Sequence, residues 1–545
     1  MKKKSSFRIL FPVILITLIA IVAFLSTSWY VNRYVRIRLQ DEFSKQTYGE
    51  YVLNIKALRL NIITQSVSFT GIKIQPVIVN PENASYEASA SKLVLQGINV
   101  LGFLSGNKIK VKSIKFTDPT IIIIRGKKYH PNSVDTRKEF SLYEYIGKFA
   151  KSLTIRNFEI SNFDFKVFDS KDELRPSIHS SNNHFKIVNL YIGPSTDAVP
   201  GQFEADSIGL KMNKFAYITT DSLYTFNVES MQMSYKDSIL QIDTVKMIPN
   251  FSKRDFGNVV GKQIDRIKIS ALQLRFIKID LRNFFEFFSI ISRKLEITGI
   301  SMNAFRDKND QHKYARPQSL QHLIKQVPSY LKIDTIQLAK SNIVYEEVAV
   351  GKKSAGRLSF NDISGNFTGL TNDSLLVSVG RDLIFKAKFK LMDESPMFAT
   401  YTFPLNTDLT SFKCSGFLTG MSIPILNPII APLTGVSIKK GIIDTLDFNF
   451  TAGEDYSNGT MKFLYHDLKL ESLKSGENDL SFKDRLNLFI ANAFIIKESN
   501  PQGKKPARIA NMHAVRDKQK FMFNYSWKTI NSGLQTTLGM PEKKK

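Results

Sequence analysis

One pattern of apolar residues decides the fold, and it is clearest in residues 329–347, SYLKIDTIQLAKSNIVYEE. Leu331 and Ile333 form one apolar pair, two polar residues follow, and Ile336 and Leu338 form a second pair. Alternation with a period of two is typical of a β-strand that has one apolar and one polar face. The stretch therefore predicts a strand whose apolar pattern is interrupted once, by a gap of two residues.

The same spacing, apolar-x-apolar-x-x-apolar-x-apolar, occurs twelve times between Leu53 and Leu470. In a regular strand the gap would turn the second pair to the opposite face of the sheet. A β-bulge restores the face, because its extra residue shifts the phase of the side chains. A tight turn between two very short strands is the alternative, and we favour the bulge. The repetition predicts a mostly β chain with one continuous apolar face.

In four of the copies a further apolar pair follows after five residues, as Ile121 and Ile123 follow Phe116. Asp118-Pro119 lies in that interval and is typical of a turn. We therefore expect each of these strands to be followed by a returning strand of a hairpin.

The apolar positions of the repeats are expected to share one trough that can bind hydrocarbon. The residues expected to line it are Ile109, Val111, Ile114, Phe116, Leu153, Ile155, Phe158, Ile160, Ile267, Ile269, Leu272, Leu274, Leu295, Ile297, Leu331, Ile333, Ile336 and Leu338.

Short amphipathic helices are expected before three of the strands, because apolar residues there recur at i, i+3, i+4 and i+7. These segments are 142–149, 284–291 and 320–327. They either lie against the apolar face or are ordinary connecting helices. Two more helices are expected at 486–494 and 523–534, where they would cap the last strand or lie on a lipid surface. The apolar run at 421–432 contains three prolines, so it is expected to be a loop, an edge or a kinked insertion.

The N-terminal residues predict a membrane anchor. Residues 9–29 carry no charge and are long enough to cross a hydrocarbon core of about 30 Å at about 1.5 Å per residue. Basic residues lie on both sides, so charge does not decide the orientation. We expect a cytoplasmic N-terminus, since no second spanning segment follows. The expected divisions are 1–8 cytoplasmic, 9–30 transmembrane signal-anchor, 31–140 first β-repeat region, 141–315 helix and second β-repeat region, 316–480 helix and third β-repeat region, and 481–545 C-terminal helices and basic tail.

The net charge of +26 raises the question of nucleic acid. The basic residues are spread along expected strands, as at Lys108, Lys110 and Lys112, which indicates a solvated outer face and not a nucleic-acid site. An anionic lipid surface is the partner that this charge favours.

No chemistry-bearing motif is apparent in the sequence. Cys414 is the one cysteine, and the seven histidines lack metal-ligand spacing. Glu346 and Glu347 are adjacent on an expected strand, so they should point to opposite faces. We therefore expect a protein that is not an enzyme and that has no metal or cofactor.

Three stretches carry a resemblance to a known family: KSLTIRNFEISNFDFKVFD (151–169), FLTGMSIPILNPIIAPLTGVSIKKGIIDTLDFNF (417–450) and RDKQKFMFNYSWKTINSGLQTTLG (516–539). Together with the N-terminal apolar segment, they resemble the AsmA-like superfamily, which includes TamB and the bridge-like lipid-transfer proteins. The resemblance implies an elongated, twisted repeating β-groove shaped as a half-pipe.

The resemblance also implies a single-pass protein of the bacterial inner membrane with its bulk in the periplasm. Its partners would be membrane phospholipids, and at the C-terminus the outer membrane or one of its proteins. Acyl chains would travel in the groove toward the outer membrane, and the family has no catalytic residues to transfer. The alternative is a periplasmic scaffold for outer-membrane proteins whose apolar face is a closed core.

Overall fold

The computed structural model describes residues 32–45, 47–61, 64–78, 84–98, 108–125, 150–170, 175–194, 203–281, 283–284, 289–310, 318–406, 411–472 and 496–540. The expected anchor at 9–30 and the expected helices at 142–149 and 486–494 lie outside these residues. None of the described helices combines the length and the apolar character that a membrane span needs.

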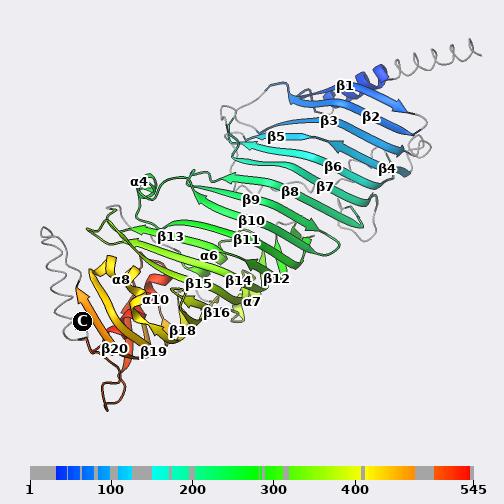
Figure 1. The fold of residues 1–545 in the computed structure, drawn as a ribbon. Helices are drawn as coiled ribbons and strands as arrows, with labels where there is room; N and C mark the ends of the chain where they lie inside the picture. Colours follow the sequence, from blue (N-terminus) through cyan, green and yellow to red (C-terminus); the bar gives the residue numbers. More distant parts are fainter. Residues whose placement is uncertain are drawn as a thin grey trace, which may run out of the picture. The chain divides into compact units, whose positions relative to one another are not determined.

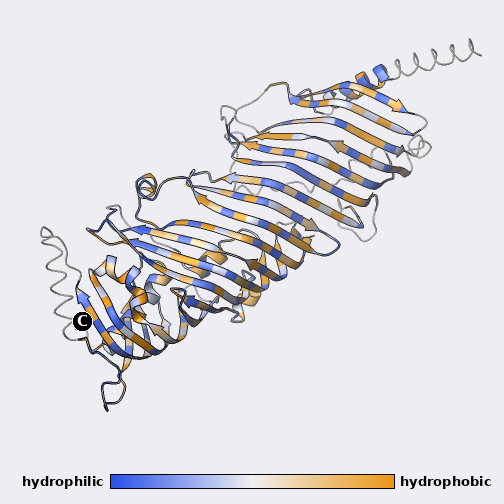
Figure 2. Ribbon diagram, in the orientation of Figure 1, coloured by the Kyte–Doolittle hydropathy of each residue, from blue (hydrophilic) through white to orange (hydrophobic). Residues whose placement is uncertain are grey.

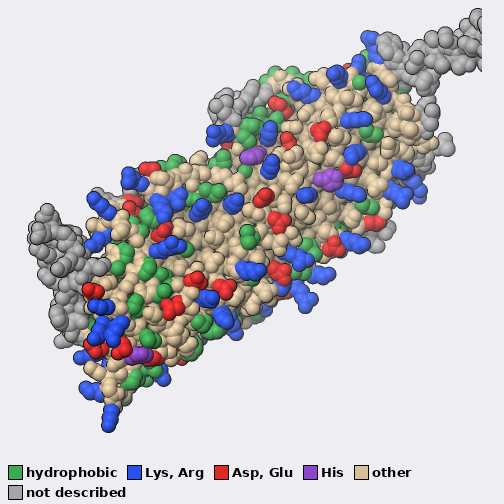
Figure 3. All heavy atoms as spheres, in the orientation of Figure 1, with side chains coloured by type: hydrophobic (Ala, Val, Ile, Leu, Met, Phe, Trp, Pro, Cys, Tyr) green, Lys and Arg blue, Asp and Glu red, His purple; other side chains and the backbone are tan. Residues whose placement is uncertain are grey.

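The fold is mostly β, as the sequence predicts, and the strands of the described residues form one mixed sheet of 21 strands (Figure 1). Contacts divide the chain into two compact units. Unit 1 runs to Ile218 and includes Val228–Asp237, and unit 2 comprises Thr219–Asn227 and Ser238 onward. Hydropathy alternates along the strands of each unit (Figure 2), and charged side chains are scattered over the face seen in Figure 3.

Unit 1 begins with a helix at 32–45 and continues as antiparallel and parallel strands. Its strands are β1 (Tyr51–Asn61), β2 (Ser66–Pro76), β3 (Ser85–Ile98), β4 (Lys108–Thr117), β5 (Thr120–Ile124), β6 (Ser152–Phe168), β7 (Ile178–Ile192) and β8 (Ser207–Ile218). Strand β9 (Tyr224–Ser234) has residues in both units.

Unit 2 contains the remaining strands and most of the described helices. The strands are β10 (Ile239–Pro249), β11 (Arg266–Ile279), β12 (Ile290–Thr298), β13 (Ser301–Asp307), β14 (Leu331–Val348), β15 (Ala355–Thr371), β16 (Asp382–Leu391), β17 (Ser395–Pro404), β18 (Phe412–Ser422), β19 (Val436–Ala452), β20 (Tyr456–Ser472) and β21 (Ile509–Val515). The helices are α4 (Phe256–Val260), α6 (Leu320–Lys325), α7 (Ser374–Ser378), η1 (Ile423–Leu426), α8 (Asn427–Thr434) and α10 (Met522–Thr537).

The expected helices are confirmed in part. α6 and α10 form where the apolar periodicity predicts them. Ile291, expected at the end of a helix, instead belongs to β12. The proline-rich run at 421–432 ends β18 and then forms η1 and α8, so it is not a central strand.

In unit 1, strands β4 and β5 continue one another where a hairpin was expected. β4 and β5 both pair antiparallel with β3 and parallel with β6, and β6 itself runs through Asn162. The chain therefore keeps its direction at Asp118-Pro119, and the predicted returning strand is wrong. Asp118 and Asn162 have positive φ, at 49° and 56°, which shifts the phase of a strand without reversing it. In unit 2, β12 and β13 pair in the same way with β11 and β14.

The two-residue gap of the repeat also differs from the bulge that we predicted. In β1 and β2, Ile55 lies opposite Ile72 and Ala57 opposite Thr70, so the register is the same on both sides of the gap. Lys56 faces Gly71, whose φ is +62°. Each strand thus bends at the same row, and no residue is added to one strand alone. Because the alternation of side chains shifts at the same position in both strands, the apolar side chains of β1 and β2 stay on the same face of the sheet. Register shifts do occur elsewhere, between Leu338 and Ser341 in β14 for example.

Candidate functional site

The apolar side chains of unit 1 form straight rows across its strands. Row A, in order from β1 to β8, consists of Leu58, Phe69, Leu93, Phe116, Ile160, Phe185 and Leu210. Row B consists of Leu60, Val67, Leu95, Ile114, Phe158, Ile187 and Ile208. The ring of Phe158 lies 6.0 Å from that of Phe116 and 6.2 Å from that of Phe185, which confirms that the two rows share one face.

Unit 2 has two rows of the same kind, and they extend over more strands. Row C consists of Leu240, Phe276, Leu295, Ile336, Phe367, Phe385, Tyr401, Cys414 and Phe450. Row D consists of Ile242, Leu274, Ile297, Leu338, Gly365, Ala387, Ala399, Gly416 and Phe448. The rings of Phe367 and Phe385 stack at 4.1 Å.

Most of the expected lining residues belong to these faces. The eight on β4 and β6 form four directly opposed pairs, from Ile109 with Leu153 to Phe116 with Ile160. In unit 2, Leu274, Ile297 and Leu338 are consecutive members of row D. Apart from Leu272, all the expected residues are buried or half-buried. Row C also contains Phe276, Phe367 and Phe385, which were not among the predicted lining residues. The alternation along 383–389 was a usable signal for Phe385.

Leu272 is the exception, and its expected place in the trough is corrected by the structure. Its side chain is 63% exposed, whereas its neighbour Ala271 is 7% exposed. Leu272 lies at the bend of β11, the position that Lys56 and Arg156 occupy in β1 and β6, and those residues are also exposed. The gap in this copy is therefore Leu272-Gln273, and Ala271 takes the inward position. The larger leucine was taken as the inward residue, although the neighbouring alanine occupies the inward position.

The apolar faces differ along unit 2 in how well they are covered. A cluster of fully buried apolar residues between Ile324 and Tyr525 closes the face at the later strands. Among the described helices, α8 contacts β14, β15 and β19, and α10 contacts β19, β20 and β21. By contrast Ile242, Leu274 and Ile297 in row D stay half-buried. The rows thus begin on a partly accessible face and end in a closed core.

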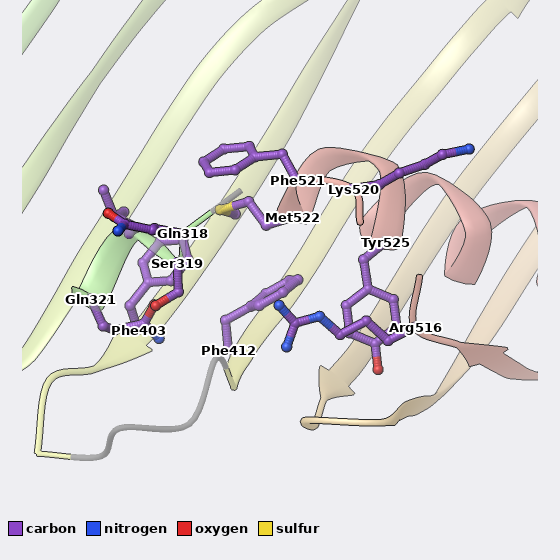
Figure 4. A pocket seen from close by; sticks show the side chains of 11 residues that line it. Gln318, Ser319, Gln321, Phe403, Phe412, Arg516, Lys520, Phe521, Met522 and Tyr525 are labelled. Atoms are coloured by element: carbon purple, nitrogen blue, oxygen red, sulfur yellow. The ribbon is translucent and has the colours of Figure 1, made fainter. Parts of the chain in front are cut away.

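A small hollow lies at the closed end, between the start of α6, the end of β17, the start of β18 and the start of α10 (Figure 4). Phe403, Phe412 and Tyr525 meet there, with the Phe412 ring 5.8 Å from that of Phe403 and 6.1 Å from that of Tyr525. Its volume of about 20 Å³ suits one water molecule.

Charged groups border the apolar face of unit 2 at one end of β11, β13 and β14. The Arg306 Nε lies 2.6 Å from an Asp265 carboxylate oxygen, and Lys308 pairs with Glu347 at 2.5 Å. Tyr345 donates its hydroxyl proton to Glu347 at 2.6 Å, and burial together with that carboxylate raises the pKa of Tyr345. Along their strands these side chains are separated from Ile267, Ala304 and Ile343 by even numbers of residues. They therefore lie on the same face of the sheet as those apolar residues. We call this group the polar rim.

The acidic side chains singled out in the sequence form separate ion pairs in the structure. Within the described residues, no group of three or more His, Cys, Asp or Glu side chains could hold a metal ion. Glu346 pairs with Lys253 and Glu347 with Lys308, so the two adjacent carboxylates point to opposite faces, as expected. A hollow of about 510 Å³ lies beside Lys253, Arg266 and Phe305 on the outward face of β11 and β13.

Comparison with known proteins does not assign the chain. No family model matches it, and no curated protein matches it.

Proposed function

We propose that the protein binds phospholipid acyl chains on its apolar rows and, held by its N-terminal segment in the bacterial inner membrane, supports lipid transport to the outer membrane or the assembly of that membrane. The observation that carries the proposal is the state of rows A to D. Large apolar side chains line up across many strands, yet most of those outside the closed end are only half-buried. Contiguous apolar surface that remains accessible is typical of a binding site.

The dimensions of row D are suitable for an acyl chain. From β10 to β16 the row crosses six strands, which at about 4.8 Å per strand gives roughly 24 Å. One leaflet of a membrane has a hydrocarbon depth of about 15 Å, half of the usual core. Each methylene removed from water on such a face contributes about 0.8 kcal/mol. Several methylenes are enough for stable but reversible binding.

The polar rim supports the same function. A phospholipid has a charged head group that must stay solvated or paired, because an unpaired charge in an apolar site is costly. Arg306, Lys308, Asp265 and Glu347 place paired charges of both signs where the apolar face of unit 2 ends. A lipid on the face can keep its head group at this border while its tail covers the rows.

Photocrosslinking tests the proposal at one pair of leucines in the same strand. A photoreactive amino acid replaces Leu274, which is half-buried in row D, in the full chain expressed in bacteria. After irradiation, mass spectrometry of the purified chain should detect a phospholipid adduct. The matched variant carries the same group at Leu272, which points outward and is 63% exposed. This variant should yield no adduct, or far less.

Equal adduct yields at both leucines would contradict the proposal, and so would the absence of lipid at Leu274. The second outcome would favour the alternative function, a periplasmic scaffold for outer-membrane proteins. The closed core of β18 to β21 under α10 is the observation that favours the scaffold, since that part of the face is fully covered.

A further inference from the structure

Helix α10 packs on the sheet through an unusually polar face. Its fully buried positions are Tyr525, Ser526, Thr529, Gly533 and Thr537. A Cβ at Gly533 would lie 2.8 Å from Met461 Sδ and 2.8 Å from Met512 Cγ, so the helix approaches β20 and β21 closely there. The helix therefore approaches the strands closely at Gly533, while Tyr525, Ile530 and Leu534 supply apolar contacts with the core.

Two large side chains on the first turns of α10 are exposed, although the same stripe of the helix packs on the core further along, at Ile530 and Leu534. Phe523 is 62% exposed and Trp527 is 55% exposed, although they are four residues apart and so lie on one side of the helix. Burying such side chains would stabilise the fold, yet at the start of α10 they stay exposed to solvent. Tryptophan and phenylalanine exposed together on a helix are typical of a membrane interface.

The charge around α10 complements an anionic surface. Between Ile496 and Met540 there are eight Lys and Arg against two Asp and Glu, a net charge of +6. Lys518 pairs with Asp455 at 2.7 Å, and Lys528 lies 3.9 Å from Asp517, so some of these cations are partly balanced. Adding Glu454 and Asp455, the two acids of unit 2 that approach this segment, still leaves a clear positive excess. Each basic group near an anionic membrane strengthens the attraction.

We propose that the exposed start of α10 is a membrane-docking surface, on which Phe523 and Trp527 enter the interface of a bilayer that carries anionic lipid. The apolar core of unit 2 closes beneath the helix, so the docking surface is separate from the rows that would hold acyl chains. The inference does not depend on acyl-chain binding, and either proposal can fail alone.

Tryptophan fluorescence tests the docking directly, because the chain contains only two tryptophans, Trp29 and Trp527. The full chain with Trp29→Phe is held in phosphatidylcholine nanodiscs, and vesicles of phosphatidylcholine with phosphatidylglycerol are added. The emission of Trp527 should shift to shorter wavelength, and brominated lipid in the vesicles or the nanodisc should quench it. Vesicles of phosphatidylcholine alone should give a smaller shift.

Variants then separate docking from a general loss of structure. Phe523→Gln should lower vesicle affinity about tenfold, because a large apolar side chain no longer enters the bilayer. Ile509→Gln is the matched control: Ile509 is 64% exposed on β21, on the side away from α10, and its replacement should leave affinity unchanged. Two results would overturn the proposal. One is a Trp527 emission unchanged by anionic vesicles, and the other is a Trp527 already shielded from aqueous acrylamide before vesicles are added.

Discussion

Gly299, which directly follows β12, packs against Leu272 at the bend of β11, and a Cβ at Gly299 would come within 2.6 Å of the Leu272 side chain. Gly299 has a φ of +71°, a conformation that side-chain-bearing residues adopt at a cost. The bend thus depends on the glycine twice, for its backbone angle and for the space over which Leu272 folds.

Gly299→Ala should therefore loosen β11 and β12. Backbone strain alone costs about 1–3 kcal/mol, and the clash with Leu272 adds to it. Hydrogen exchange of the amides in both strands should accelerate. The control is Gly351→Ala, since Gly351 has a φ of +74° but no atom within 4 Å of its Cβ position. Its loss of protection should be smaller, and Leu272→Ala should restore part of the loss in the first variant. Equal losses at both glycines would show that the clash is unimportant.

The buried hydroxyl pair beneath α10 gives a second prediction. Ser457 Oγ and Thr529 Oγ1 lie 2.6 Å apart, and both residues are 0% exposed. Thr529→Val leaves Ser457 without this partner and should destabilise the closed core by about 1–3 kcal/mol. The double variant with Ser457→Ala should lose about 1 kcal/mol less than the sum of the single changes, because the pair is then removed together. Urea unfolding of the three variants measures the coupling free energy between the two hydroxyl groups. Strictly additive changes in the free energy of unfolding would show that the hydroxyl pair does not contribute to stability.

Cys414 provides a probe of the closed core, since it is 3% exposed and is the chain's single thiol. Burial raises the pKa of the Cys414 thiol to about 12. At pH 8 a maleimide should therefore react only when the core opens, much more slowly than in the unfolded chain. Thr419→Cys in a Cys414→Ala background places a thiol at an exposed position of the same strand and should react fast.

The same pKa shift predicts how alkali affects the core. An unfolded cysteine ionises near pH ~8.5, while the folded Cys414 stays protonated up to about pH 12. The contribution of this thiol to the free energy of unfolding is therefore fully present below pH ~8.5. It is lost as the pH rises toward the folded pKa. Cys414→Ala should abolish this component of the alkaline destabilisation. A pH dependence that the alanine variant retains in full would assign it to other groups.

The helix at 32–45 covers the outer edge of β1, and this contact predicts how the chain avoids association. Arg36 donates to the Lys56 carbonyl at 3.0 Å and Gln40 to the Leu53 carbonyl at 2.9 Å. Replacing both with Ala should expose the edge and increase concentration-dependent self-association, measured by sedimentation velocity. Arg38→Ala is the control, because Arg38 bonds to Tyr34 within the helix. Association that increases as much with Arg38→Ala would point to charge and not to the edge.

The strand pattern was predictable where apolar residues alternate with polar residues, so that both faces of the strand can be assigned from the sequence. At Leu331, Ile333, Ile336 and Leu338, alternation and gap match β14 and its bend, because polar residues mark the outward positions. The form of the bend was harder to predict from the sequence. Its form depends on the opposite strand, so a single stretch cannot distinguish an extra residue in one strand from a shared bend in both.

Features that depend on distant partners were not predictable. Whether Asp118-Pro119 reverses the chain is decided by β3 and β6, which both continue past it. In α10, the expected apolar stripe is covered only in its later part: Ile530 and Leu534 pack on the core, while Phe523 and Trp527 at its start are exposed. Helical periodicity gives the spacing of a face, but only the packing partner determines which face is buried.

The split-strand connectivity of β3 to β7 recurs in β11 to β15, and this has a consequence for how such a chain can grow. Each strand in the block takes its ladder bonds from immediate neighbours, so the block is a module that can be inserted or deleted whole. One added block would lengthen a sheet by about 19 Å, four strand positions at ~4.8 Å each. The length of the sheet can therefore change in fixed increments, while a single set of covering helices, α8 and α10, closes the core at its C-terminal end.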